Sequence, residues 1–243
     1  MEWFKHWFNS KEYLNVYQHR DKEDARELLQ LVLNNIDTEN VRTVLDMAAG
    51  YGRHAEILSK KGFDVTAVDL SEMLLNIARN NAEEENLNIE FVRSDIRKFN
   101  PDKKFDLIIN LFTSIGYFDE DEENFKVLNK AYNLLAENGY FILDYMNKNF
   151  VRNTLVPLSV DKTDDGTIIQ NRYIKGDRII KEIIIEREGK QNKYYESVRM
   201  FSYDELISIM QKIGFRVLKT FGDFLGNPFE LETSPRIIVI SHK

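Results

Sequence analysis

The sequence contains no cysteine, and this absence excludes several kinds of chemistry. Without cysteine there is no disulfide framework, no thiolate metal site and no cysteine nucleophile. The four histidines lack the close spacing of metal ligands, so we expect no metal site. Apolar runs are too short to span a bilayer, and no internal repeat or low-complexity segment is present.

Basic residues are also fewer than acidic ones. Lys and Arg total 33 against 40 Asp and Glu, which gives a formal net charge of −7. This balance opposes non-specific attraction to a nucleic acid backbone. The leading residues are aromatic and polar rather than basic and then apolar, so we expect no secretory signal. We therefore expect a cytoplasmic protein, a monomer or homodimer, that acts on a small molecule and binds neither nucleic acid nor membrane.

Strands and helices alternate from Thr43 onward, which predicts a doubly wound α/β fold with a mostly parallel sheet. The first buried strand spans 43–47 and the second ends at Asp69. Three further strands are expected at 89–92, 105–111 and 140–145. The strand at 105–111, the fourth in the chain, is almost continuously apolar, as expected when helices cover both faces of a sheet.

The alternation breaks between residues 157 and 201. Three strand-like stretches there are separated by turn signals such as Lys175-Gly176-Asp177, which predicts two or three antiparallel strands without a helix. Alternation resumes at Ser202 with a capping box and two closing strands. We expect one domain over 1–243, with an N-terminal aromatic lid or helix (1–36), a cofactor-binding core (41–147), an antiparallel substrate cap (157–201) and a completion of the core (202–243).

A tight turn after the first strand points to a nucleotide-type crevice. Gly50-Tyr51-Gly52-Arg53-His54-Ala55 matches the dinucleotide fingerprint, so an NAD-dependent oxidoreductase is one interpretation. A dinucleotide places its pyrophosphate at such a turn. Asp46, which ends the preceding strand, would repel that group and suits an ammonium group instead.

Carboxylates stand at the ends of the first three strands. Asp69 can accept hydrogen bonds from both ribose hydroxyls. Asp95 can accept one from an exocyclic amine, with Ile96 beside it for the adenine face. Together with Asp46, these residues favour a ligand that combines adenine, ribose and a cationic amino acid tail. S-adenosylmethionine has these parts and carries a sulfonium as well.

The motifs VLDMAAGYGRH, VDLSEMLLNIAR, SDIRKF and NLFTSIGYF occur in that order. With them the chain resembles the class I S-adenosylmethionine-dependent methyltransferases, over roughly Tyr13 to Pro157 plus the closing strands. Within that superfamily it is most similar to small-molecule enzymes, including sugar N,N-dimethyltransferases. The resemblance implies a seven-stranded Rossmann-like sheet with strand order 3-2-1-4-5-7-6 and an antiparallel last strand. Two positions differ from the usual motif, because Ala48 replaces the first glycine and Tyr51 occupies a small-residue position.

The resemblance also implies roles for individual residues. Ala48, Gly50 and Gly52 form the turn that approaches the methionine portion. Met73 packs on ribose or adenine, and Leu111 lines the pocket beneath the sulfonium. Two residues of the N-terminal segment close over the cofactor, namely Tyr17 and Arg20.

Methyl transfer from a sulfonium mainly requires alignment of an N or O nucleophile in line with the methyl group. If a base removes a proton, the candidates are Tyr117, after the fourth strand, and Asp144, Tyr145 and Asn147, at the end of the fifth. His54 is interpreted as a packing residue. Besides the NAD-dependent oxidoreductase, a protein that binds S-adenosylmethionine without catalysis remains an alternative.

Overall fold

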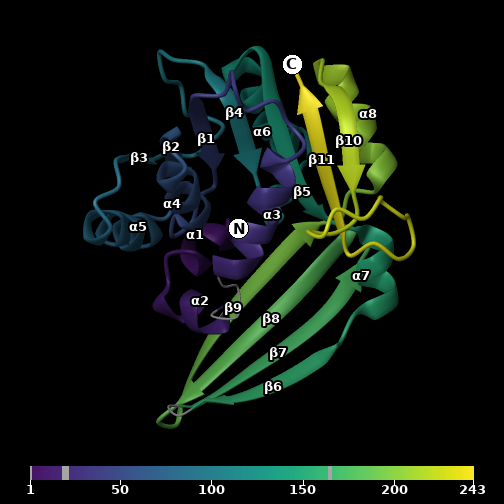
Figure 1. Ribbon diagram of the computed structural model, residues 1–243. Coiled ribbons are helices and arrows are strands. Elements are labelled where there is room, and N and C mark those ends of the chain that lie inside the picture. The colour runs from purple at the N-terminus through teal and green to yellow at the C-terminus, as the bar shows by residue number, and fades with distance from the viewer. Residues whose placement is uncertain (1, 18–21, 164–165) are drawn as a thin grey trace.

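The protein, described by a computed structural model over residues 2–17, 22–163 and 166–243, contains two β-sheets (Figure 1). The larger sheet has seven strands in the order β10-β11-β5-β4-β1-β2-β3. Its strands are β1 (Thr43–Met47), β2 (Asp64–Asp69), β3 (Ile89–Arg93), β4 (Phe105–Asn110), β5 (Leu135–Met146), β10 (Arg216–Phe221) and β11 (Arg236–His242).

This topology confirms the predicted strand order 3-2-1-4-5-7-6. Strands β1 to β5 pair in parallel, and β11 pairs antiparallel with both β5 and β10. One boundary differs from the expectation, because β5 begins at Leu135 and not after Gly139. The carboxyl ends of β1, β2 and β4 therefore meet at one edge of the sheet, where a ligand can contact several strands.

Helices cover both faces of this sheet, because alternate residues of each buried strand point to opposite sides. Val44 packs with α3 (Lys22–Leu33) and α4 (Arg53–Lys60), whereas its neighbour Leu45 packs with α6 (Asp121–Leu134) and α8 (Tyr203–Ile213). Helix α5 (Glu72–Glu84) lies on β2 and β3. No described helix is long and apolar enough to cross a membrane.

The second sheet extends away from the core below the ends of β4 and β5 (Figure 1). It follows α7 (Lys148–Thr154) and has four antiparallel strands rather than the two or three expected: β6 (Leu158–Thr163), β7 (Gly166–Lys175), β8 (Arg178–Arg187) and β9 (Lys190–Arg199). The Gly176-Asp177 turn joins β7 to β8, and Glu188-Gly189 joins β8 to β9. Positive φ angles at Gly176, Glu188 and Gly189 fit these tight hairpin turns.

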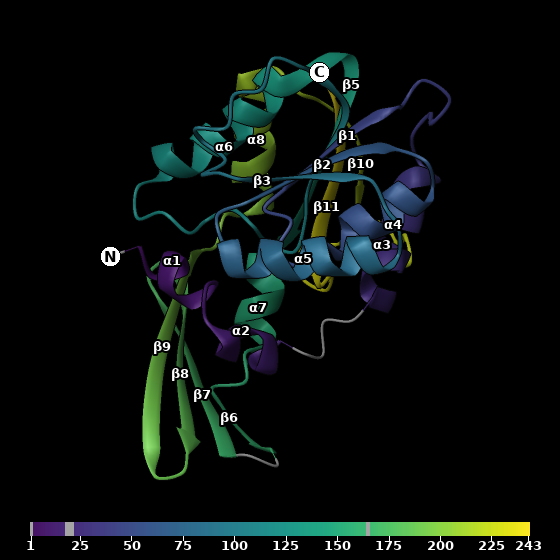
Figure 2. The ribbon, with the colours of Figure 1, turned by 90° about the vertical axis from the view of Figure 1, so that its left-hand side faces the viewer.

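The N-terminal segment, residues 2–17, lies between the two sheets. It contains α1 (Trp3–Trp7) and α2 (Lys11–Val16), and both Figure 1 and Figure 2 place it beside β9 and α5. Trp7 and Tyr17 pack in one apolar cluster with Ile168 and Ile183 of the second sheet. At the other side, Ser71 Oγ at the start of α5 donates to the Phe8 carbonyl at 2.7 Å. The segment therefore bridges core and second sheet.

The turn after β1 uses left-handed backbone at three positions. Ala48, Gly50 and Gly52 have φ of 63°, 60° and 83°. The left-handed φ of Ala48 explains why glycine is usual at this position. Gly52 also packs closely, because a Cβ atom there would lie 2.8 Å from Cβ of Ala78 on α5, whereas a Cβ on Gly50 would meet nothing within 4 Å.

We expect Gly52→Ala to destabilise the fold more than Gly50→Ala. Both variants pay the left-handed cost of about 1–2 kcal/mol, and only Gly52→Ala adds overpacking of about 1–3 kcal/mol against α5. Urea denaturation of the ligand-free variants measures the difference. Equal losses in the two variants would show that α4 and α5 do not pack closely at Ala78.

Candidate functional site

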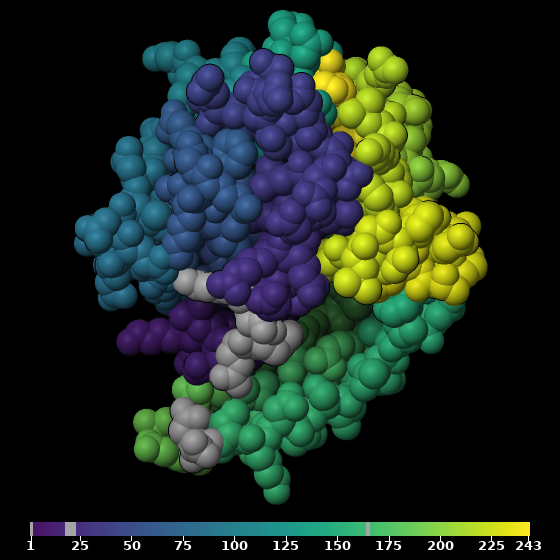
Figure 3. Space-filling view, in the orientation of Figure 1, coloured from purple at the N-terminus to yellow at the C-terminus, as the bar shows by residue number. Residues whose placement is uncertain are grey.

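Two adjoining cavities lie along the carboxyl edge of the larger sheet. The strand-end cavity is bounded by the ends of β1 to β3 and by the N-terminal segment, and the inter-sheet cavity lies between β1, β4 and the second sheet. Figure 3 shows the N-terminal segment, in purple, between the core and the green strands of the second sheet. The two cavities share six lining residues, which are Phe8, Tyr13, Ala48, Gly50, Ser114 and Tyr117. Two ligands in these cavities would therefore touch.

Asp69 lies at the end of β2 on the wall of the strand-end cavity. Its carboxylate accepts hydrogen bonds from the backbone amides of Gly50 and Ser71, both at 2.8 Å. Burial raises the pKa of Asp69, and these backbone hydrogen bonds oppose the rise. The interaction with Gly50 also fixes the turn after β1 relative to β2.

Asp95 follows β3 and lines the same cavity together with Ile96. Its carboxylate accepts from Arg97 Nε at 3.0 Å and from the Arg97 backbone amide at 3.0 Å. The side-chain hydrogen bond from Arg97 is the main reason why the pKa of Asp95 is lowered. Arg97 in turn lies 3.9 Å over the ring of Phe118. Asp95 is thus an ionised acceptor at the wall where adenine was expected.

Asp46 ends β1 on the wall of the inter-sheet cavity and is only 1% exposed. Burial, together with the nearby charge of Asp69, raises its pKa to about 7, although Arg53 opposes this shift. Its Oδ2 atom has no hydrogen-bond partner among the described residues. Buried polar atoms are almost always paired, so an unpaired carboxylate oxygen on a cavity wall indicates a place for a ligand donor.

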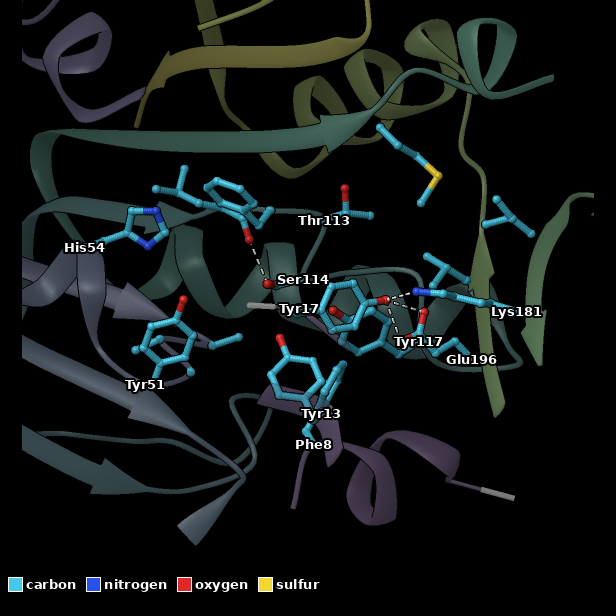
Figure 4. Close-up of a pocket in the computed structure, with 18 of the residues that line it drawn as sticks. Phe8, Tyr13, Tyr17, Tyr51, His54, Thr113, Ser114, Tyr117, Lys181 and Glu196 are labelled. Atoms are coloured by element: carbon cyan, nitrogen blue, oxygen red, sulfur yellow. Dashed lines mark hydrogen bonds between the residues drawn. The ribbon is translucent and has the colours of Figure 1, made fainter. Parts of the chain in front are cut away.

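His54, on the first turn of α4, lines the inter-sheet cavity (Figure 4). The centroid of its ring lies 5.4 Å from that of Phe112. Burial, with the charge of Arg53, lowers the pKa of His54 to about 3, so the imidazole is neutral at physiological pH. Its Nε2 atom is buried and has no partner among the residues that the structure describes. A neutral ring in contact with Phe112 agrees with the packing role interpreted from sequence and leaves one nitrogen able to meet a ligand.

Glu196 on β9 holds the N-terminal segment against the inter-sheet cavity. The Tyr17 hydroxyl donates to its two carboxylate oxygens at 2.7 and 2.8 Å, and Trp7 Nε1 donates at 2.5 Å. Lys181 of β8 donates to the Tyr17 hydroxyl at 2.8 Å (Figure 4). The predicted cofactor residue Tyr17 therefore stands on the wall of the inter-sheet cavity, fixed by contacts to the second sheet.

The loop after β4 is held in an unusual conformation by Asp144. Phe112 and Thr113 both have positive φ, at 55° and 59°, which is costly for residues with a β-carbon. Asp144 accepts from the Phe112 amide at 2.8 Å and from Arg236 Nε at 2.7 Å. Asp144 is fully buried and is not among the described residues that line either cavity. Its position supports the shape of the loop rather than contact with an acceptor.

Tyr145 points to the opposite face of the sheet from Asp144. It packs with Phe201 in the cluster under α6 and α8, and its hydroxyl donates to the carbonyl of Arg199. Burial raises the pKa of Tyr145. Asn147 donates to the carbonyls of Leu231 and Ser234, both at 2.8 Å, and is not among the described residues that line either cavity. Of the predicted catalytic residues, the structure brings only Tyr117 to the cavities, where the centroid of its ring lies 5.2 Å from that of Trp3.

The remaining predicted residues are distributed around the same site. Leu111 lines the inter-sheet cavity, and Ala48 and Gly50 line both cavities. Gly52 lies behind the turn against Ala78. Met73 contributes a backbone amide that donates to Asn9 at 3.2 Å, and its neighbour Leu74 lines the strand-end cavity instead. Arg20 lies outside the described residues.

Sequence reasoning assigned no site residue to the second sheet, yet three charged side chains of that sheet line the inter-sheet cavity: Arg172, Lys181 and Glu196. The hairpin turns that fix their register were visible in the sequence. Asn9 and Ser71, whose hydrogen bond connects the N-terminal segment to α5, were also not identified as residues near the site. Ser71 is recognisable from the sequence only as the N-cap of α5, and Asn9 belongs to no recognisable spacing pattern.

The residues present fit S-adenosylmethionine. Carboxylates at the ends of β1, β2 and β3 can meet its ammonium, ribose and adenine, in the order in which these groups occur in the molecule. The unpaired Oδ2 atom of Asp46 is the observation that supports the ammonium contact. The sulfonium supplies an activated methyl group.

Comparisons with known proteins agree with this assignment. The model of the family described as "Methyltransferase domain" matches residues 44–139. A Geobacillus sp. (strain WCH70) protein, provisionally described as a methyltransferase, is 26% identical over 238 residues, which cover 90% of this chain and 91% of that protein. Glycine/sarcosine N-methyltransferase of Aphanothece halophytica is 26% identical over 207 residues, with 80% of this chain and 74% of that protein covered.

Solved structures share the fold over nearly the whole chain. An S-adenosylmethionine-dependent methyltransferase from Clostridium acetobutylicum ATCC 824 superposes with a TM-score of 0.82 at 20% identity and covers 95% of both chains. An S-adenosylmethionine-bound amino pentose methyltransferase from Micromonospora echinaspora gives a TM-score of 0.69 at 16% identity, covering 96% of this chain and 98% of that chain.

The affinity for S-adenosylmethionine is expected to fall as the pH drops through 7. Asp46 has a pKa of about 7 in the free protein, and only its ionised form attracts an ammonium group. Between pH 7.5 and 6 the dissociation constant should rise, approaching about tenfold at one unit below the pKa. Calorimetry on the wild type and on Asp46→Asn measures this, and the variant should bind weakly with no such rise. The same acid-side slope in Asp46→Asn would assign the titration to another group.

Proposed function

The chain is a class I S-adenosylmethionine-dependent methyltransferase, and from this premise we propose that it methylates a nitrogen atom of a small-molecule acceptor. The observation that carries the proposal is the pair of adjoining cavities with shared walls. The strand-end cavity, with the adjacent Asp46, holds S-adenosylmethionine, and the inter-sheet cavity holds the acceptor. The two ligands meet where Ser114 and Tyr117 line both.

The walls of the inter-sheet cavity limit the size of the acceptor. The cavity is covered by the N-terminal segment, which Glu196 ties to the second sheet through Trp7 and Tyr17. The second sheet itself forms the opposite wall through residues such as Ile179 and Val198. A nucleic acid or a folded protein does not fit between walls joined in this way, whereas a small molecule does.

The groups on the walls favour nitrogen over oxygen as the nucleophile. An alcohol needs a strong base to become nucleophilic, whereas an amine is nucleophilic in its neutral form. Asp46 is assigned to the ammonium group of S-adenosylmethionine, and His54, with a pKa of about 3, is too weak a base to take a proton from an alcohol. The glycine/sarcosine N-methyltransferase relative is also named for transfer to nitrogen.

Catalysis then rests mainly on alignment. Bound S-adenosylmethionine would supply the methyl group: the acceptor nitrogen would bond to the methyl carbon as the carbon–sulfur bond breaks, and the sulfur of the departing S-adenosylhomocysteine would keep the electron pair. The nitrogen would then lose a proton to solvent or to a wall carboxylate. Orientation of this kind can lower a barrier by up to about 7–11 kcal/mol in the best cases. We propose that Tyr117 orients the acceptor, because its ring stands at the junction between Trp3 and Phe8, with centroids 5.2 and 5.5 Å away.

A methyl-transfer screen tests the proposed function. Pairs of amines and alcohols with the same carbon skeleton, amino sugars and amino acids included, are incubated with the protein and S-adenosylmethionine, and mass spectrometry detects a mass increase of one methyl group. We expect products from amines and none from the matching alcohols. Products from alcohols alone would refute nitrogen transfer, and cofactor binding without any product would favour the non-catalytic alternative.

Tyr117→Phe keeps the ring at the junction and removes the hydroxyl with which Tyr117 would hold the acceptor in line, so it is expected to lower kcat by roughly tenfold to a hundredfold. Tyr145→Phe removes the same hydroxyl from the opposite face of the sheet, where it contacts the carbonyl of Arg199. That variant should keep kcat within about threefold while losing about 1 kcal/mol of stability. Steady-state kinetics and thermal denaturation of both variants provide the comparison. A larger kcat loss in Tyr145→Phe would return the catalytic role to the fifth strand.

A further inference from the structure

Three charged side chains form a row across the second sheet, on the face that lines the inter-sheet cavity. Arg172 on β7 lies directly opposite Lys181 on β8, and Lys181 lies directly opposite Glu196 on β9. All three line the cavity. Cβ atoms of directly opposed residues are about 4.5–5.5 Å apart. The row therefore places two cations next to each other.

Like charges directly opposite one another destabilise a sheet. The placement of Arg172 opposite Lys181 therefore lowers the stability of the second sheet, and packing alone does not explain it. Arg172 donates hydrogen bonds to uncharged oxygens, which are Gln170 Oε1 at 2.8 Å, Ser159 Oγ at 3.2 Å and the Val156 carbonyl at 3.5 Å. Glu196, at the end of the row, already accepts from Trp7 and Tyr17. The charge of Arg172 is thus not balanced by the carboxylate of its own row.

Other cations on the cavity wall are accounted for by their surroundings. Arg236 pairs with the buried Asp144 at 2.7 Å. Arg53 lies 4.2 Å over the ring of Phe112 and opposes the pKa shift of Asp46. Arg172 differs from both, because its hydrogen-bond partners within residues 2–17, 22–163 and 166–243 are neutral and its cross-strand neighbour on β8 is another cation.

We propose that Arg172 and Lys181 form a subsite for an anionic group of the methyl acceptor, either a carboxylate or a phosphate. A guanidinium beside an ammonium matches such an oxyanion in charge and in donor geometry. The assignment rests on the proposed function, since it describes the acceptor that the inter-sheet cavity takes. The acceptor then carries an amine at the junction of the cavities and an anion at the second sheet.

Thermal denaturation with simple anions tests the subsite without relying on catalysis. The protein is saturated with S-adenosylhomocysteine, so that the strand-end cavity is filled, and is titrated with inorganic phosphate or with acetate at constant ionic strength set with sodium chloride. One or both anions should raise Tm by about 3–6 °C at ten times the dissociation constant. A response to acetate indicates a carboxylate acceptor, and a response to phosphate alone indicates a phosphorylated one.

Three variants separate the subsite from general charge effects. Arg172→Gln should raise the dissociation constant of the responding anion about tenfold, and Arg172→Lys, which keeps the charge, should recover part of the affinity. Lys193→Gln is the control. It removes one positive charge from an exposed position of β9 and should respond like the wild type. Tm values in sodium chloride alone check that each variant is folded.

The outcomes separate this proposal from the proposed function. No response of the wild type to either anion, or equal responses of wild type and Arg172→Gln, would overturn the subsite. With catalysis as the readout, amines that carry a carboxylate or phosphate should lose about tenfold in kcat/KM on Arg172→Gln, and uncharged amines should lose little. If no amine is methylated while the anion response of wild type exceeds that of Arg172→Gln, the nitrogen-transfer function fails and the anion subsite stands.

Discussion

The contact of the Glu196 carboxylate with the N-terminal segment is the interaction on which both cavities depend. Trp7 and Tyr17 donate to this one side chain from two short helices, and Phe8 and Tyr13, which lie between them, line both cavities. Two helices of five and six residues have little stability of their own. Charge-assisted hydrogen bonds to the second sheet therefore decide whether the segment covers the site.

A second carboxylate shapes the opposite wall. Asp144 stabilises left-handed backbone at Phe112 and Thr113, and its pairing with Arg236 links the ends of β5 and β11 to that loop. Removing one partner of a buried pair leaves an uncompensated charge, which is strongly destabilising. The position of Ser114 and Tyr117 at the junction of the cavities thus depends on residues about thirty and about 120 positions further along the chain. Both sides of the site are built from non-local contacts.

Local rules sufficed to predict one half of the site. Parallel strands end at a common edge, so Asp46, Asp69 and Asp95 could be placed together from their positions after apolar runs. The prediction that both Asp144 and Tyr145 of the fifth strand face the site does not follow from these rules. Consecutive strand residues face opposite sides of a sheet, so Asp144 and Tyr145 could not both face one ligand. The burial of both, and the contacts that hold them, could be known only from the packed structure.

For the second sheet, the sequence predicts the register of the strands but not the face that meets the core. The two-residue turns at Gly176-Asp177 and Glu188-Gly189 fix the hairpin registers, and those registers alone align Arg172, Lys181 and Glu196. Which face of the sheet meets the core cannot be derived in this way, because both faces carry large side chains: Ile183 is buried inside, whereas Tyr195 is 42% exposed outside. The N-terminal segment selects the face by packing Trp7 against Ile183 and its neighbours. A row of charges that would be an ordinary solvated stripe on the other face becomes, through this packing, a wall of the inter-sheet cavity.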